Sequence, residues 1–381
     1  MPIHIVRIIA AATAAIWICL AVFRGFFWRL RERLHAAPDA TGGGVAVTVV
    51  ISARDEAELI GTAVRSLRSQ RFPGALRVIV ADDESSDSTA EQALAAGADQ
   101  VIRVAARPPG WKGKLWAVSR GIAAETGAAD YFLLTDADIE YVSGDVLAAL
   151  IARMETGPGF DLVSVMVRLS CQSLPEKLLI PAFVFFFFML YPPGWVSNGR
   201  GAAAAAGGCM LIRRTTLEKI GGIEAIRDAL IDDCALAQRV KAAGGRVWLG
   251  LSDEETEVRS TRTYGHAAEI RTMISRAAFS QLRHSVFLLA GTVAGMLLTY
   301  VAPVALLFSR DVFSVACGAG AWLLCSAMFL PMVRYYRAPL WTAVSLPAVA
   351  LFYLAATLES AVNYWSGRGG AWKGRVQDEI T

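Results

Sequence analysis

The stretch FLLTDAD, residues 132–138, is an apolar run of strand type that ends in two carboxylates, Asp136 and Asp138. Side chains one residue apart on a strand point to opposite faces, but where the strand enters a turn both can converge on one cation. A divalent ion such as Mg²⁺ or Mn²⁺ takes oxygen ligands and leaves room for substrate phosphates. An acidic turn without an ion is the alternative, because Asp is common in turns. The stretch therefore predicts a metal site only if other acids join it.

Short β-branched segments upstream of this stretch indicate a parallel sheet. Residues 45–52 (VAVTVVIS) and 77–81 (RVIVA) have the character of buried strands, and residues 56–70 between them place apolar side chains at helical spacing. This βαβ opening predicts an α/β fold.

Polar residues follow the second strand and a later loop. Asp82 and Asp83 open the cluster DDESSDST, and in open parallel sheets an acid beyond a strand's carboxyl end can bind a ribose. Part of this cluster is expected to cap the next helix. Lys114 ends the loop PPGWKGK, where it could reach a diphosphate as a point charge, the alternative being a solvated lysine.

A second acid pair, Asp232 and Asp233, begins a helix expected to run through Lys241. The helix dipole favours acids at an N-terminus, which accounts for one of them more readily than for two. Ahead of this pair, residues 199–212 are rich in Gly and Ala, which suits either a close approach of the backbone to a bulky ligand or a close-packed turn.

The amino-acid composition indicates that part of the chain lies in a bilayer. Of 381 residues, 55% are hydrophobic and only 19% charged, which is more apolar than a soluble enzyme requires. The net charge of +3 is too small to argue for nucleic acid as a partner. Six cysteines without paired spacing indicate neither a zinc site nor a disulfide framework, as expected of reduced thiols in the cytosol.

The N-terminus is expected to be a membrane anchor, residues 1–28. Residues 8–23 carry no charge, and arginines follow them at Arg24, Arg29, Arg31 and Arg33. By the positive-inside rule this order leaves the downstream chain in the cytosol and the N-terminus outside, whereas a cleaved signal peptide is the competing interpretation. Residues 38–44 are expected to form a linker.

The C-terminal region, residues 285–365, is expected to cross the membrane. No charge occurs in residues 286–309, 312–333 or 338–358, and each run is long enough to span. Residues 178–191 (LLIPAFVFFFFMLY) are too few to span and suit an interfacial or re-entrant segment or a core helix. A cationic helix is expected over residues 267–284, directly before the C-terminal region.

Taken in order, the acid clusters make residues 45–284 resemble the family 2 glycosyltransferases. Within that family the motifs PGWKGKLWAV, LLIPAF and IDDCALA resemble the hopene-associated glycosyltransferases. The resemblance implies a GT-A-like nucleotide-diphospho-sugar transferase domain with N- and C-terminal transmembrane helices. It also implies a multi-pass protein of the cell inner membrane, with its catalytic domain in the cytoplasm.

The resemblance further implies roles for individual residues. Asp233 would be the general base beside Asp232, and Asp136 and Asp138 would hold the sugar diphosphate and a divalent metal. The nucleotide of a UDP-sugar donor would lie against the residues Ala53, Arg54, Glu56 and either Asp82 or Asp83. The expected acceptor is a lipid, with a hopanoid as the specific expectation, and a polyprenyl phosphate or ceramide-type lipid or a non-catalytic scaffold as alternatives.

One position departs from the family pattern. Processive and ceramide-type relatives carry Gln or Arg, two further residues and then Arg-Trp, whereas this chain has MISRA at residues 273–277. Arg276 matches and the Trp does not, which argues against processive polymer synthesis and leaves Arg276 as the expected substrate contact.

Overall fold

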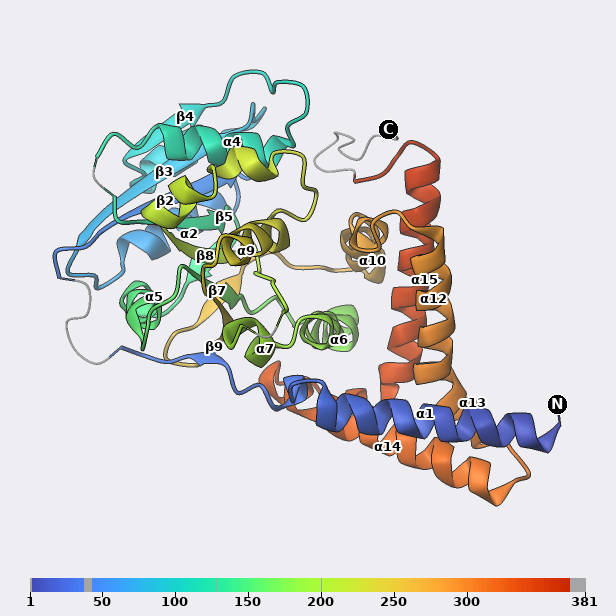
Figure 1. The fold of residues 1–381 in the computed structure, drawn as a ribbon. Coiled ribbons are helices and arrows are strands. Elements are labelled where there is room, and N and C mark those ends of the chain that lie inside the picture. Colours follow the sequence, from blue (N-terminus) through green and yellow to red (C-terminus); the bar gives the residue numbers. More distant parts are fainter. Residues whose placement is uncertain (1, 38–42, 128, 200, 371–381) are drawn as a thin grey trace. The chain divides into compact units, whose positions relative to one another are not determined.

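The computed structural model describes residues 2–37, 43–127, 129–199 and 201–370, which divide into two compact units (Figure 1). An α/β unit comprises Arg31–Ser170 and Pro193–Arg262, and a helical unit comprises Met1–Leu30, Cys171–Pro192 and Thr263–Thr381. Two segments of the expected 45–284 domain, residues 171–192 and 263–284, thus pack with the helical unit. Most of the expected linker, residues 38–42, lies outside the described residues.

The α/β unit is built on an eight-stranded sheet in the order β1-β9-β7-β8-β5-β2-β3-β4. All neighbouring strands are parallel except β8, which runs antiparallel to β5 and β7. The strands are β1 Arg33–Leu34, β2 Ala46–Ala53, β3 Ala75–Asp82, β4 Gln100–Arg103, β5 Tyr131–Asp136, β7 Leu162–Met166, β8 Cys209–Arg213 and β9 Val247–Ser252. A small antiparallel sheet pairs β6 (Ile139–Tyr141) with β10 (Val258–Ser260).

The strand register brings the predicted polar residues to one edge of the sheet. Ala53 at the end of β2 pairs with Asp82 at the end of β3, and Ser52 pairs with Asp136 at the end of β5. Because parallel strands share one carboxyl edge, the acids that follow β3 and β5 lie on the same side of the unit.

Helices cover both faces of the sheet. Val47, Val49 and Ile51 of β2 point into a core shared with α2, α3 and α5, whereas Val50 points toward α4. Gly121 makes this second contact possible, because a Cβ there would lie 2.4 Å from Val50 Cγ1. The helices of this unit are α2 Ile60–Arg68, α3 Thr89–Ala95, α4 Gly113–Ala123, α5 Val146–Glu155, α7 Pro193–Ser197, α8 Arg214–Lys219, η2 Ile223–Ile226 and α9 Asp232–Ala242.

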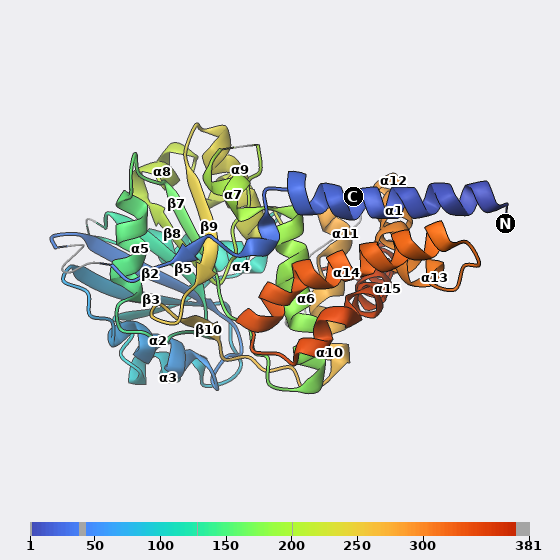
Figure 2. The same cartoon turned by 90° about the horizontal axis from the view of Figure 1, so that it is seen from below.

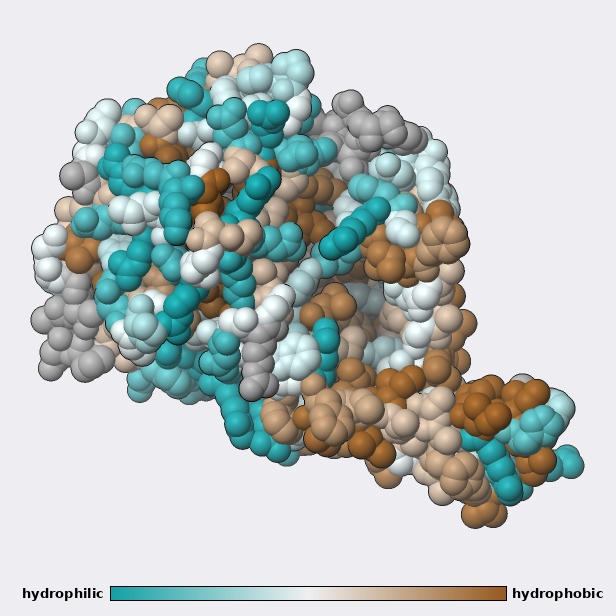
Figure 3. Space-filling model, in the orientation of Figure 1, coloured by the Kyte–Doolittle hydropathy of each residue, from teal (hydrophilic) through white to brown (hydrophobic). Residues whose placement is uncertain are grey.

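The helical unit contains four helices long and apolar enough to span a membrane, at residues 3–23, 286–306, 312–335 and 340–365. Figure 3 shows hydrophobic residues over the surface of these helices. The elements of the unit are α1 Ile3–Phe23, η1 Phe27–Arg29, α6 Leu174–Leu190, α10 Ala267–Ser275, α11 Ala278–Gln281, α12 Val286–Met296, η3 Leu297–Val301, α13 Ala302–Leu306, α14 Val312–Tyr335, η4 Leu340–Ser345 and α15 Leu346–Trp365.

Two pairs of helices cross one another inside this unit. Helices α1 and α14 run side by side in the same direction, and Arg7 of α1 forms an ion pair of 2.7 Å with Asp311, the residue that caps α14. Helices α12 and α15 run crosswise to them, as Figures 1 and 2 both show. A π-helical turn, η3, separates α12 from α13.

Three segments differ from the sequence-based expectation. The helix predicted over residues 267–284 is two helices, α10 and α11, because helical structure is interrupted at Arg276 and Ala277. The backbone also has positive φ at Arg283 and His284. Residues 178–191 belong to α6, which begins at a capping box between Ser173 and Glu176 and buries Ile180, Phe185 and Phe188. The segment is thus a helix with buried side chains. The Gly/Ala-rich residues 199–212 end in strand β8, which was not predicted.

Candidate active site

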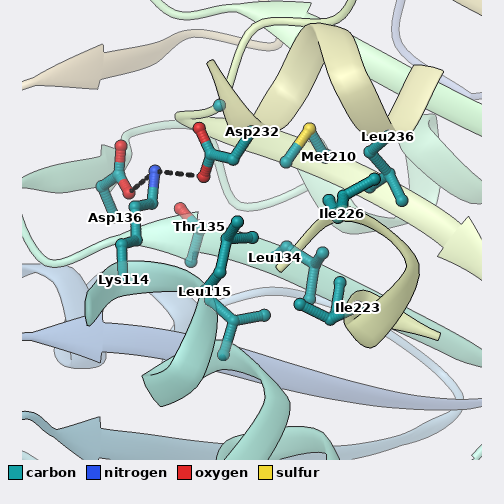
Figure 4. Close-up of a pocket in the computed structure, with 12 residues that line it drawn as sticks. Lys114, Leu115, Leu134, Thr135, Asp136, Met210, Ile223, Ile226, Asp232 and Leu236 are labelled. Atoms are coloured by element: carbon teal, nitrogen blue, oxygen red, sulfur yellow. Dashed lines mark ion pairs between the residues drawn. The ribbon is translucent and has the colours of Figure 1, made fainter. Parts of the chain in front are cut away.

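A partly buried lysine joins two of the predicted acid clusters. Lys114, in the first turn of α4, places Nζ 2.8 Å from Oδ1 of Asp136 and 3.2 Å from Oδ2 of Asp232 (Figure 4). Asp136 ends β5 and Asp232 begins α9, so three elements meet at this cation. The sequence predicted Lys114 as a diphosphate ligand, and the structure gives it two carboxylate partners.

Polar and apolar side chains together line the pocket at this cluster. Its lining includes Lys114, Asp136, Thr135, Gly207 and Asp232, and the apolar residues Leu115, Val118, Leu134, Met210, Ile223, Ile226 and Leu236. Charges interact more strongly beside apolar side chains than in water. Burial lowers the pKa of Lys114, but attraction to Asp136 and Asp232 outweighs it, so the pKa is raised and the amine stays protonated.

Burial raises the pKa of Asp136, and the neighbouring charge of Lys114 reverses this only in part. Asp136 side-chain exposure is 34%, which leaves its carboxylate accessible from the pocket. The carboxylate can therefore meet a ligand while it remains paired with Lys114.

Backbone amides hold Asp233 beside this cluster. Gly207 N–H donates to Oδ2 of Asp233 at 2.9 Å, and Cys234 N–H donates to Oδ1 at 2.6 Å. A Cβ at Gly207 would lie in ordinary contact, 3.5 Å from Asp233 Oδ2 and 3.4 Å from Lys114 Nζ. The backbone at Gly207 thus contacts side chains of the protein itself, and the approach to a bulky ligand stays a prediction.

The pKa of Asp233 is raised to about 6. Burial is the largest cause and the charge of Asp232 adds to it, whereas Lys114 and the two amides act in the opposite direction. The start of a helix favours an ionised acid, but for Asp233 burial outweighs the two amides and the charge of Lys114. A carboxylate with a pKa near 6 remains ionised at neutral pH and is a better proton acceptor than an ordinary aspartate.

The residues expected to meet the nucleotide lie at the carboxyl ends of β2 and β3. Arg54 donates to the backbone oxygen of Asp83 at 2.9 Å and lies 3.5 Å from its Oδ2. Asp82 is buried and accepts from Ser85 N–H at 3.1 Å, which shapes the turn that follows. Ala53 is also buried, and Glu56 N–H donates to Thr89 Oγ1. Arg54 and Asp83 therefore form one preorganised pair.

Arg262 is a residue of this edge that the sequence did not single out. Its Nη2 lies 2.6 Å from Oε1 of Glu56, and its Nε lies 3.3 Å from Oδ2 of Asp138. Ser260 Oγ also donates to Oδ2 of Asp138 at 2.7 Å. The only sequence signal for Arg262 is its place in an arginine-containing segment, because 124 residues separate it from Asp138.

Asp136 and Asp138 provide oxygen donors of the kind that Mg²⁺ and Mn²⁺ prefer. No group of three or more His, Cys, Asp or Glu residues is arranged to hold a metal within the described parts of the chain. Magnesium is commonly held by one or two carboxylates together with substrate phosphates. The two aspartates thus fit a metal that arrives with a diphosphate better than a metal held by protein ligands alone.

Arg276 belongs to the helical unit, whereas the other predicted site residues belong to the α/β unit. It is exposed at the end of α10. Its role as a substrate contact stays a prediction.

Known proteins resemble this chain in part. A glucosyl-3-phosphoglycerate synthase of Mycolicibacterium smegmatis is 33% identical over 37% of this chain and 46% of that protein. A 4,4'-diaponeurosporenoate glycosyltransferase of Staphylococcus aureus is 32% identical over 32% of this chain and 31% of that protein. The chain therefore spans less than half the length of either relative.

A solved structure extends the likeness in fold. A mannosyltransferase from Pyrobaculum calidifontis, determined in complex with GDP-Man and Mn²⁺, superposes with a TM-score of 0.52 at 18% identity and covers 94% of this chain and 98% of that one. The predicted GT-A-like α/β fold, with apolar helices at both ends, is thereby confirmed. Residues 48–221 match the family described as Glycosyl transferase family 2, so this chain contains a glycosyltransferase family 2 domain.

Proposed function

We propose that this protein is a membrane-bound inverting glycosyltransferase that moves a sugar from a nucleotide-diphospho-sugar to a lipid acceptor. One observation carries the proposal: Lys114 and Asp136, which lie among the residues that match family 2, meet Asp232 of α9, and Asp233 lies beside them. The end of β5 and the start of α9 supply these acids. The apolar residues of the pocket strengthen the electrostatic interactions of these acids with Lys114.

In this proposal Asp233 acts as the general base. It accepts the proton of an acceptor hydroxyl as that oxygen attacks the anomeric carbon of the sugar, and the nucleoside diphosphate leaves from the opposite face. General-base help contributes about two to four orders of magnitude to such a rate. The pKa of about 6 for Asp233 suits this role at neutral pH.

The donor is proposed to bind along the carboxyl edge of the sheet. Arg54 and either Asp82 or Asp83 would contact the nucleotide, for which uridine is the proposed base. Asp136 and Asp138 would hold the sugar diphosphate and a divalent cation. When bound, that cation offsets charge on the leaving diphosphate.

The acceptor is proposed to be a lipid because four helices are apolar enough to enter a bilayer. A hopanoid is the specific proposal, supported by the motif resemblance, and the relative named for a carotenoid acid agrees with an apolar acceptor. A polyprenyl phosphate or ceramide-type lipid would use the same chemistry. We place the protein in the cell inner membrane with its α/β unit in the cytoplasm, where sugar nucleotides are made.

Release of nucleoside diphosphate tests the proposal. Purified full-length protein with Mn²⁺ or Mg²⁺ and a UDP-sugar is expected to release UDP faster when hopanoid lipid is added. Asp233→Asn is the matched inactive variant. Faster release with a polyprenyl phosphate alone would reassign the acceptor. No release with any lipid, from protein that binds the donor, would favour a non-catalytic scaffold.

A further inference from the structure

The guanidinium of Arg262 bridges two acids from separate loops, Glu56 after β2 and Asp138 after β5. Nη2 lies 2.6 Å from Glu56 Oε1, and Nε lies 3.3 Å from Asp138 Oδ2. The Glu56 and Asp138 side chains are only 10% and 14% exposed, whereas that of Arg262 is 34% exposed. The two carboxylates are thus largely buried, and the guanidinium between them is more exposed to solvent.

The backbone around Arg262 is fixed independently of this side chain. Thr261 N–H donates to the backbone oxygen of Asp138 at 2.8 Å, and Thr261 Oγ1 donates to the same oxygen at 3.0 Å. The preceding residues form strand β10, which pairs with β6 directly after Asp138. The guanidinium can therefore leave Asp138 by rotation about side-chain bonds while segment 260–262 stays in place.

The charges around Asp138 set a condition for metal binding. A divalent cation on Asp138 Oδ2 would stand close to a guanidinium that already contacts the same oxygen, and like charges at this separation repel strongly beside buried groups. A metal can occupy the site only if the arginine moves or if further negative charge arrives. A nucleotide diphosphate supplies such charge, and arginine is well suited to bind it.

We propose that Arg262 is a positioning residue. Its guanidinium pairs with Asp138 in the donor-free protein, and it leaves Asp138 to pair with the diphosphate when metal and donor bind together. The arginine thereby makes metal affinity depend on the nucleotide. This inference rests on the proposed function, because that function places the metal at Asp138.

Direct measurement of Mn²⁺ binding to full-length protein in detergent tests the proposal without turnover. We expect Arg262→Gln to bind Mn²⁺ about tenfold more tightly than wild type when no nucleotide is present, because a competing charge is removed. Added UDP should tighten Mn²⁺ binding markedly in wild type and several-fold less in the variant. Arg262→Lys, which keeps the charge, should stay close to wild type without nucleotide.

Arg259→Gln is the matched control. Arg259 lies on β10, three residues before Arg262, and pairs with Glu140 at 2.9 Å, so its loss should leave Mn²⁺ affinity unchanged. Thermal unfolding of each variant separates a change in affinity from a loss of fold.

The outcomes distinguish the two proposals. If Asp138→Asn weakens Mn²⁺ binding and Arg262→Gln binds as wild type does, the role of Arg262 is overturned and the metal assignment stands. Equal tightening in Arg262→Gln and Arg259→Gln would also overturn it, because the effect would then be one of net charge. If Asp138→Asn binds Mn²⁺ with UDP as well as wild type does, the metal assignment and the inference both fail.

Discussion

Lys114 Nζ lies 2.8 Å from Oδ1 of Asp136, which ties the first turn of α4 to the end of the central strand β5. The same amine reaches Asp232 at 3.2 Å, so one cation offsets two carboxylates from separate segments. Without it, these acids and Asp233 would repel one another. Lys114 therefore permits the acid cluster to form before any substrate binds.

Asp233→Asn tests the proposed base. Asn keeps the size of the side chain and can still accept the Gly207 hydrogen bond, but it cannot take a proton. We expect turnover to fall at least about a hundredfold with little change in donor affinity. Steady-state rates and donor titrations give both quantities. Near wild-type transfer by Asp233→Asn, together with loss of transfer in Asp232→Asn, would reverse the two roles.

The rate should depend on pH in a defined direction. Asp233 must be ionised to accept a proton, and its pKa is raised to about 6. Below that pH, kcat/KM should fall about tenfold per pH unit, and above it a plateau is expected. With an ordinary aspartate as the base, kcat/KM would begin to fall about two pH units lower. A flat profile between pH 5 and 7, measured on protein that remains folded, would rule out this base.

Lys114→Met should shift the acid limb of this pH profile, which is the range in which kcat/KM falls as pH decreases. Lys114 acts to lower the pKa of Asp233, so its removal is expected to raise the pKa and to shift the limb to higher pH. The residual rate of the variant, followed across pH, measures the shift. Lys112→Met, two residues earlier at the N-cap of α4, is the control and should leave the limb in place.

Asp138→Asn should remove metal-dependent donor binding. Asp138 accepts a hydrogen bond from Ser260 and pairs with Arg262. Asn is therefore a better test than Ala, because it keeps the size and can retain the Ser260 hydrogen bond. Calorimetry with a UDP-sugar should show affinity reduced at least about tenfold and no further loss with a chelator. Tight binding that ignores both the substitution and the chelator would contradict the assignment.

The α/β unit should face the cytoplasm. Gln92 is exposed on α3, so Gln92→Cys introduces a thiol on the surface of this unit. An impermeant maleimide should label it in inside-out vesicles and leave it unlabelled in intact cells. The parent protein without the new cysteine gives the background from Cys171. Labelling in intact cells would invert the proposed topology.

The sequence indicated the sheet and the acids because their signals are local. Residues 45–52 and 77–81 are β-branched runs, and Asp82 and Asp136 are the last residues of β3 and β5, so parallel pairing with β2 brings them to one edge. Arg262 has no such signal, since its bond to Asp138 depends on the pairing of β10 with β6. The same holds for the pKa of Asp233, which burial sets and which the start of a helix does not reveal.

The crossed helices of the helical unit bear on how many times the chain can traverse a bilayer. A lipid slab has a single normal, and Arg7 and Asp311 place the starts of α1 and α14 together, so these two helices would enter from the same leaflet. If they stand along the normal, α12 and α15, which run crosswise, lie in the plane of the slab. In that orientation, four apolar helices supply two full crossings.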